Sequence, residues 1–229
     1  MKEIQFNERK QHGLPDFPFQ YYYIDSTHPQ YVMPLHWHGE FELIRVISGS
    51  FNLFLDNVPF TLNEGDSAII DCTTMHRGTP DNTTYECIVF SISMLYKKSN
   101  DIIRQYIRPI AHKKVSVERI PTGNTKALIN EIFNTASQKK NMYELKIHSL
   151  LFDFFLSLYD EKLITTQEKH KNAKQMEVIG ELLDWIEENF TESITLSSLS
   201  KVSGLNQKYL CRFFKEFRKL IFLRSKLVC

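Results

Sequence analysis

The sequence has few cysteines, and their spacing suggests neither a metal knuckle nor a disulfide framework. Cys72, Cys87, Cys211 and Cys229 lie far apart and form no C-x-x-C pair, which argues against a zinc finger and a disulfide-rich secreted fold. No apolar run approaches the roughly 20 residues that a membrane-spanning helix needs. The first residues carry charges where a secretory signal has its apolar stretch. We therefore expect a cytoplasmic protein.

The chain also lacks a large net charge of either sign. Its 28 Lys and Arg residues and 27 Asp and Glu residues leave a formal charge of +1, so the total charge points to neither a nucleic acid nor a membrane. The charges are unevenly placed, however. Residues 175–192 carry six acidic side chains and no Lys or Arg, whereas residues 201–226 carry eight basic side chains and one acidic one. The basic segment is able to contact phosphates.

Residues 1–98 have the pattern of antiparallel β-structure. Short apolar runs occur at 41–47, 51–55, 67–70 and 86–92, and turn-forming residues separate them at 48–50, 56–57, 63–66 and 77–78. Closely spaced short strands of this kind favour a barrel or a sandwich.

Residues 99–162 have a helical pattern, clearest in LINEIFNTASQ and in YELKIHSLLFDFFLSLYDEKL. The second run predicts one broad apolar face, formed by Leu145, His148, Leu151, Phe152, Phe155, Leu156 and Tyr159. Such a helix packs either on the β-structure or against the same helix of a second subunit. The polar residues 163–174 are predicted to be a linker.

Residues 175–229 contain the pattern of a helix-turn-helix. Thr195 is suited to cap a short helix that runs through Val202, Gly204 to form the tight turn, and Asn206 to cap the next helix. This arrangement leaves Gln207, Lys208, Cys211 and Arg212 on the outer face. The alternative is a three-helix bundle with a solvated charged face.

The segment ITLSSLSKVSGLNQKYLCRFFKEF resembles the first helix-turn-helix of AraC-type regulators over roughly residues 175–217. The resemblance implies DNA contacts from Asn206, Gln207, Lys208, Cys211, Arg212 and Lys215. Members of that family continue into a second helix-turn-helix of roughly 50 further residues, whereas this sequence continues as FRKLIFLRSKLVC. We therefore expect an incomplete reader with weakened DNA affinity, because each good base contact contributes roughly 1–3 kcal/mol.

His36, His38, Glu42 and the later His76 form a second motif. Strand alternation places the first two imidazoles on the same side, and imidazoles with a carboxylate suit Mn, Fe, Ni or Zn. The motif resembles the cupin pattern, which implies a small β-barrel and a ligand set of these four residues. The match is incomplete, because Asp71-Cys72-Thr73 replaces the expected Pro-x-Gly.

Three interpretations of this motif remain open. A bound metal would make an enzyme conceivable. Without a metal, these residues and Arg45 would form an effector pocket, or the histidines would simply be hydrogen-bonded residues of the barrel. The aromatic run Phe17, Phe19, Tyr21, Tyr22 and Tyr23 resembles the N-terminal arm of AraC-type sensors, and the alternative for it is an edge strand.

Together these patterns predict an α+β protein with an antiparallel cupin-like β-barrel (1–98), a helical dimerisation region (99–162), a linker (163–174) and an incomplete all-α helix-turn-helix segment (175–229). The expected function is that of an AraC-type transcription regulator, a homodimer whose partners are DNA and a small-molecule effector. No enzymatic activity is expected, and no cofactor unless a divalent metal binds. The alternatives are a metal-dependent cupin enzyme and a truncated chain that is either a remnant without DNA binding or a dominant-negative partner of intact subunits.

Overall fold

The computed structural model describes residues 8, 10–96, 101–166, 182, 185, 186, 189 and 193–211. The chain divides into two compact units, an N-terminal unit of residues 2–167 and a C-terminal unit that begins at residue 168. Among the helices described by the structure, none combines the length and the apolarity that crossing a membrane requires.

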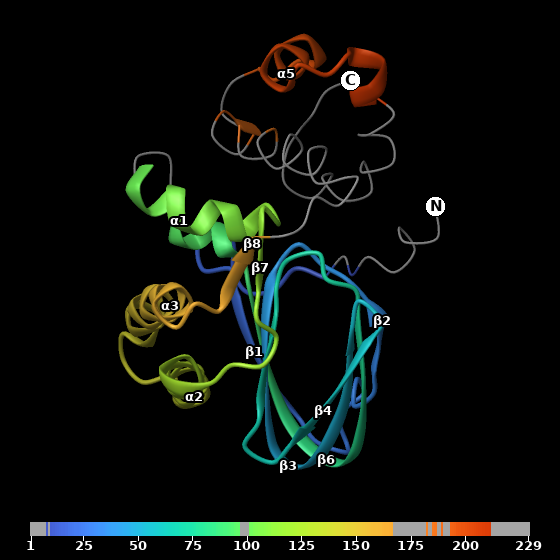
Figure 1. Ribbon diagram of the computed structural model, residues 1–229, viewed down its shortest axis with the longest axis vertical. Helices are drawn as coiled ribbons and strands as arrows, with labels where there is room; N and C mark the ends of the chain where they lie inside the picture. The colour runs from blue at the N-terminus through green and yellow to red at the C-terminus, as the bar shows by residue number, and fades with distance from the viewer. Residues whose placement is uncertain are drawn as a thin grey trace. The chain divides into compact units, whose positions relative to one another are not determined.

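The N-terminal unit is built on a six-stranded antiparallel sheet (Figure 1). Its strands are β1 (Phe19–Ile24), β2 (Met33–His36), β3 (Phe41–Leu55), β4 (Val58–Asn63), β5 (Ser67–Ile70) and β6 (His76–Phe90). The long strands β3 and β6 pair along their whole length. β1 and β5 extend one end of this pair, while β2 and β4 extend the other. The fold therefore has two sheet layers that share β3 and β6.

The bend between the layers lies at Ser48-Gly49-Ser50. The sequence predicts a turn here, but the chain continues as one strand whose register shifts around Ser48. Gly49 has φ +77°, and a Cβ atom on it would lie 2.3 Å from the carbonyl oxygen of Asn82. Such a position favours glycine and marks a bulge that bends the strand. The predicted turn at 77–78 likewise lies inside β6.

The predicted antiparallel class is confirmed, with one refinement. Among the strands that the structure describes, β1, β2, β4 and β5 are edge strands, so the hydrogen-bond ladder does not close into a ring. The predicted barrel is thus a curved, two-layered sheet. The predicted turns at Asp56-Asn57 and at 63–66 are both present, with left-handed backbone at Asp56 and Asn57 (φ 48° and 67°) and at Gly65 (φ 81°).

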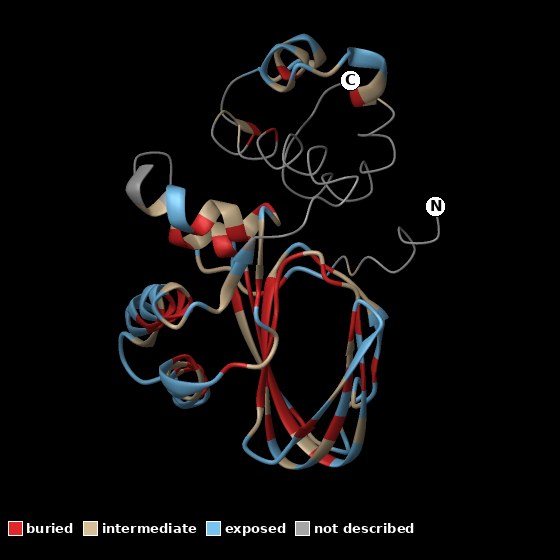
Figure 2. Cartoon of the chain, viewed as in Figure 1, coloured by how far each residue is buried: buried red, intermediate tan, exposed pale blue. Residues whose placement is uncertain are grey.

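Two apolar cores follow from the strand alternation. The first lies between the sheet layers and contains Ile24, Met33, Ile44, Val46, Phe51, Leu53, Leu55, Leu62, Ala68, Ile70, Tyr85 and Cys87. The second joins the opposite face of one layer to the helices, with Phe41 and Phe90 contacting Phe155. Figure 2 shows the buried faces of the helices turned toward the sheet.

The predicted helical region contains the 3-10 helix η2 (Ile92–Leu95) and the helices α1 (Asp101–Ala111), α2 (Gly123–Gln138) and α3 (Tyr143–Asp160). It also contains the strand β7 (Val115–Val117), which pairs with β8 (Ile164–Thr166). The linker predicted at 163–174 is therefore wrong at its start. β8 forms there, and Leu163 and Ile164 pack against the second core. The rest of the predicted linker lies outside the described residues.

The predicted apolar face of α3 is rotated in the structure. Its buried residues are Ile147, Leu150, Leu151, Phe154, Phe155, Ser157 and Leu158. Leu145 and Leu156, which the sequence analysis placed on the packing face, are 68% and 59% exposed. The helix carries apolar residues on two sides, and the periodicity analysis therefore predicted a packing face that lies between the two.

Candidate functional site

Four side chains predicted from the sequence meet at one end of the sheet. His36 ends β2, His38 precedes β3, Glu42 lies in β3 and His76 begins β6. One potential ligand atom from each lies within 4.8 Å of the others. The structure thus brings together a cluster whose members are up to 40 residues apart in the sequence.

Each imidazole is oriented by its Nδ1 atom. The Nδ1 atoms of His36, His38 and His76 lie 2.8, 3.2 and 2.8 Å from the backbone carbonyl oxygens of Pro34, Glu40 and Thr74. Carbonyl partners at Nδ1 favour a proton there, so Nε2 carries a lone pair when the ring is neutral and a second N–H when the ring is protonated. The Nε2 atoms of His38 and His76 lie 3.1 and 3.2 Å from Oε2 of Glu42.

Burial and charge act against each other in this cluster. Burial alone would raise the pKa of Glu42, but hydrogen bonds and charge from His38 and His76 hold that pKa well below its ordinary value. Burial works against the charged form of His38, yet its bond to Glu42 raises the pKa of His38. Burial, with repulsion from His76, lowers the pKa of His36. The cluster therefore keeps an ionised carboxylate among imidazoles.

A pocket of about 260 Å³ opens beside the cluster. Its lining residues come from the N-terminal segment, β1, β2, β3, β6 and the loop before β2: Glu8, Lys10, His12, Tyr22, Ile24, Gln30, Met33, Pro34, Leu35, His36, Glu42, Tyr85, Cys87 and Val89. Mixed apolar walls with a few polar groups are typical of small-molecule sites.

The sequence analysis missed Glu8, Lys10 and His12. Oε2 of Glu8 lies 3.5 Å from Nε2 of His36 and 3.6 Å from Nε2 of His12. The nearby imidazole of His12 lowers the pKa of Glu8, with burial opposing and the charge of His36 adding to the effect. No spacing signal could have found these residues, because the return of this segment to Trp37 is a tertiary contact.

Arg45 was predicted to lie in the effector pocket, and this prediction is wrong. Alternation along β3 turns it to the opposite face from Glu42. Its Nη2 lies 2.7 Å from Oε2 of Glu86, its Nη1 donates to Asn134, and the guanidinium stacks 4.8 Å from the ring of Phe133. Arg45 therefore connects Glu86 of the sheet to residues of α2 and stabilises the packing of α2 on the sheet.

The aromatic run near the start of the chain is a strand in the structure. Residues 19–24 pair along β6 as β1, so the edge-strand interpretation is confirmed. The hydroxyl of Tyr21 donates to Glu86 at 2.6 Å, whereas Tyr22 lines the pocket. The strand therefore contributes one aromatic wall of the pocket.

The C-terminal unit contains the predicted turn between two helical segments. Helix α5 (Leu196–Ser203) begins with a capping box in which the Thr195 side chain accepts from the Ser198 N–H at 3.1 Å. Gly204 has left-handed backbone (φ 66°). Oδ1 of Asn206 accepts from the Tyr209 N–H at 2.8 Å and caps the helical segment 207–211. These predicted caps are confirmed.

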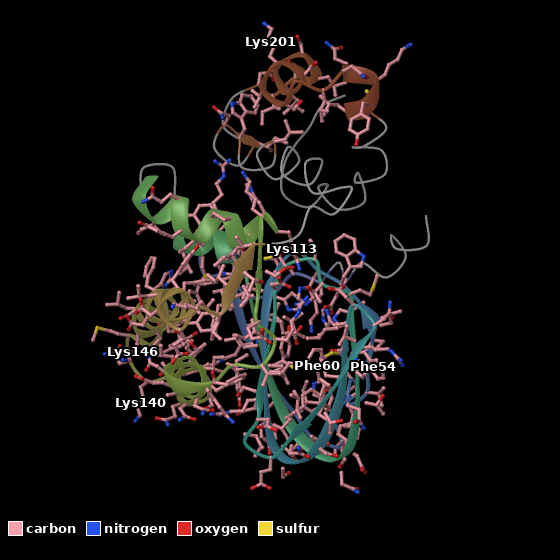
Figure 3. All side chains as sticks on the ribbon, in the orientation of Figure 1. Phe54, Phe60, Lys113, Lys140, Lys146 and Lys201 are labelled. Carbon is pink, nitrogen blue, oxygen red and sulfur yellow. The ribbon has the colours of Figure 1, made fainter. Side chains whose placement is uncertain are left out.

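The residues predicted to contact DNA are only partly described. Asn206, Gln207 and Lys208 are exposed and Cys211 is half-buried, while Leu210 packs in a small core with Leu182, Ile186 and Leu199. Lys201 of α5 also points outward (Figure 3). Arg212 and Lys215 lie outside the described residues. The outer face of this unit is therefore polar and basic where the structure shows it.

Comparison with known proteins assigns the N-terminal unit to a family. Residues 18–155, more than half of the chain, match the model of the AraC-like ligand binding domain. The chain therefore belongs to the family of proteins that carry this domain.

Curated relatives agree with this assignment. The uncharacterized HTH-type transcriptional regulator YdeC of Bacillus subtilis is 24% identical over 80% of this chain and 65% of its own length. The melibiose operon regulatory protein of Escherichia coli is 22% identical over 83% of this chain and 66% of its own length. The chain thus spans just under two thirds of these relatives. Among solved structures, ToxT from Vibrio cholerae matches with 14% identity and a TM-score of 0.45, over 91% of this chain and 78% of its own.

Proposed function

We propose that this chain is a ligand-responsive transcription regulator in which the N-terminal unit binds an effector and the C-terminal unit binds DNA. The observation that carries the proposal is the pair of capped helical segments around Gly204 that present Gln207 and Lys208 to solvent. The family of the N-terminal unit supports the effector-binding half. The relatives named above are regulators, and we propose no catalytic role for the histidine cluster.

In the proposed complex, the segment that Asn206 caps lies in the major groove. An amide side chain such as that of Gln207 pairs with adenine, and a lysine such as Lys208 contacts either guanine or a phosphate. Basic side chains nearby, Lys201 among them, contribute sequence-independent affinity through counterion release.

We further propose that the active form is a homodimer held through α3. Leu145, Ser149, Phe152 and Leu156 recur at steps of four, three and four residues on the exposed side of the helix. This spacing gives a narrow apolar stripe of the kind that joins paired helices. Ser149 at its centre is small enough for a second helix to approach closely.

The four-residue cluster is proposed to hold a divalent metal ion. His36, His38, Glu42 and His76 fit such an ion, because three imidazoles and one carboxylate converge and carbonyl groups hold the other ring nitrogens. The ion would order the pocket wall next to the effector.

Effector binding regulates the protein only if the effector prefers one arrangement of the dimer over another, since equal affinity for both shifts no population. The pocket provides this opportunity, because residues from four strands and from the N-terminal segment line it. A ligand that draws these elements together would change how the DNA-binding units of the two subunits are positioned on the DNA.

The test is binding of the full chain to the DNA upstream of its own gene, compared with a scrambled duplex, by fluorescence anisotropy across a salt series. Specific binding is expected, with Gln207→Ala reducing the preference for the upstream DNA. Lys208→Ala is expected to weaken binding to both duplexes and to reduce the salt slope by about 1.

The matched control is Lys140→Ala, which removes an exposed lysine from the loop between α2 and α3 and is expected to bind like the wild type. Equal affinity of the wild type for both duplexes, or a Lys208→Ala variant that behaves like the control, would contradict the proposal.

A further inference from the structure

The carboxylate of Glu8 lies against the pocket although it belongs to a segment that precedes the first strand. The Glu8 N–H donates to the carbonyl oxygen of Trp37 at 2.9 Å, which fixes the backbone beside the histidine cluster. Its Oε2 faces the Nε2 atoms of both His36 and His12. At 3.5 and 3.6 Å these contacts are longer than good hydrogen bonds. Glu8 thus sits close to two nitrogen atoms that it does not fully satisfy.

His12 is the second observation. Its ring is 5% exposed, and Nδ1 lies 2.9 Å from the hydroxyl of Tyr22. His12 lines the pocket, and its buried Nε2 has no hydrogen-bond partner, since Oε2 of Glu8 is 3.6 Å away. A buried polar atom without a partner is costly and uncommon in native proteins. A ligand atom that reached Nε2 of His12 would remove that cost.

The charges around this point favour an anion. Glu42 already has two imidazole partners, His38 and His76. The remaining groups beside Glu8 that can bind an anion are His12, through its unpartnered Nε2, and Lys10, whose Nζ lies 4.3 Å above the ring of Tyr22. Glu8 is the negative group among them. This part of the pocket therefore has room for one acidic group, which is the Glu8 carboxylate in this structure.

The rest of the pocket has a different character. Ile24, Met33, Leu35, Tyr85 and Val89 supply apolar walls. The volume of about 260 Å³ lies just below the roughly 300 Å³ at which pockets for drug-sized ligands begin. The ligand that matches these walls is small and has an apolar body.

We propose that Glu8 occupies the subsite for the acidic group of the effector, and that the pocket takes a small organic acid whose carboxylate replaces that of Glu8 beside Nε2 of His12. The inference rests on the proposed function only in treating this pocket as the effector site. Glu8 is tethered four residues from His12, so it competes at a high effective concentration. Removing its charge removes both the competitor and a like-charge repulsion.

The experiment is calorimetric titration of the full, EDTA-treated chain with benzoate and hexanoate and with their neutral amides, benzamide and hexanamide. Glu8→Gln is expected to bind at least one of the two acids about tenfold more tightly than the wild type, a change of about 1.4 kcal/mol. Its affinity for the amides is expected to stay unchanged. Adding Lys10→Gln to this variant is expected to weaken acid binding again.

The control is Glu64→Gln, which neutralises an exposed glutamate in the turn between β4 and β5 and is expected to bind like the wild type. Thermal unfolding verifies that each variant is folded. Failure of folded Glu8→Gln to bind either acid, or equal affinity for acid and amide, would overturn the proposal. DNA binding is measured separately, so a chain that binds acids but no DNA rejects the proposed function and leaves this inference standing.

Discussion

The Nδ1 atoms of three histidines decide which atoms of the cluster are available to a ligand. Because backbone carbonyl oxygens face Nδ1 of His36, His38 and His76, the Nε2 atoms and the Glu42 carboxylate converge. A histidine buried only to fill space would have no reason to share this orientation with two others.

At this residue scale we predict that the chain binds one Zn²⁺ ion and that His76→Ala reduces the affinity at least about tenfold, because loss of a coordinating group costs no less than loss of a supporting residue, which costs about 10–100-fold. Equilibrium dialysis with metal analysis measures this affinity. Zn²⁺ at a hundred times its dissociation constant is expected to stabilise the wild type by about 2.7 kcal/mol.

The control for the metal experiment is His28→Gln, which changes a half-buried histidine before β2 that is not part of the cluster. Zinc binding by His76→Ala with the affinity of the wild type would show that the cluster is not the site.

At the scale of elements, a buried ion cluster joins the loop between β5 and β6 to the segment between α1 and α2. Oδ1 of Asp71 lies 2.6 Å from both Nζ of Lys113 and Nη1 of Arg119. Lys113 lies beside the end of the sheet next to β7 and β8 (Figure 3). Thr74 takes part in the same cluster through its hydroxyl, and its carbonyl faces Nδ1 of His76. The cluster thus links His76 to the residues on either side of β7.

We predict that Asp71→Asn lowers the free energy of unfolding by about 3 kcal/mol, at the lower end of the range for breaking a buried pair, because Lys113 and Arg119 keep some contact with water. Urea unfolding measures the loss. Asp66→Asn, which breaks an exposed pair with Lys126, is the matched control and is expected to cost at most about 1 kcal/mol.

The effect of Asp71→Asn depends on pH. Burial would raise the pKa of Asp71, but the charges of Lys113 and Arg119 outweigh it and hold that pKa below its ordinary value of 3.8. The carboxylate therefore stabilises the fold fully above that value, and the contribution disappears as the pH falls through the lower pKa of the folded state. The difference between wild type and variant is expected to be constant near neutral pH and to shrink below about pH 4. A difference that grows on acidification would contradict this account.

At the scale of the whole molecule, the exposed stripe on α3 is expected to join two chains. We predict sedimentation at twice the chain mass of 27.0 kDa for the wild type and at the chain mass for a Leu145→Asp, Leu156→Asp double variant. Two charges in an apolar interface cannot be buried without partners. Because both side chains are already exposed, the subunit fold is expected to persist.

The control is Val58→Asp, a charge placed on an exposed apolar residue of the β3–β4 hairpin, which is expected to sediment like the wild type. A monomeric wild type, or a double variant that still dimerises, would exclude α3 as the interface.

Local patterns predicted the parts of this molecule that depend on local interactions. Thr195, Gly204 and Asn206 have the roles that their sequence context indicates, since caps and left-handed turns involve neighbouring residues. The strand runs at 41–47 and 67–70 were found for the same reason. The turn predicted at 48–50 failed, because whether a glycine ends a strand or bends it depends on the partner strand, here β6.

The residues around the histidine motif include both correct and incorrect predictions. Alternation and a family resemblance identified His36, His38, Glu42 and His76, but the same alternation should have excluded Arg45, which lies on the other face of β3. The packing face of α3 was misplaced because a helix with apolar residues on two sides does not state which one meets the sheet.

The sequence by itself determined the antiparallel and helical class and the caps of the C-terminal helices, because each depends on residue type and short-range spacing. It also indicated the four residues of the cluster, through strand alternation and the resemblance to the cupin pattern. Only the tertiary structure decided that Glu8 and His12 reach the pocket, that Arg45 leaves it, and that Asp71 meets two cations from a distant segment. Those contacts join residues far apart in the chain, and their geometry is set by the burial of apolar side chains that no local pattern records.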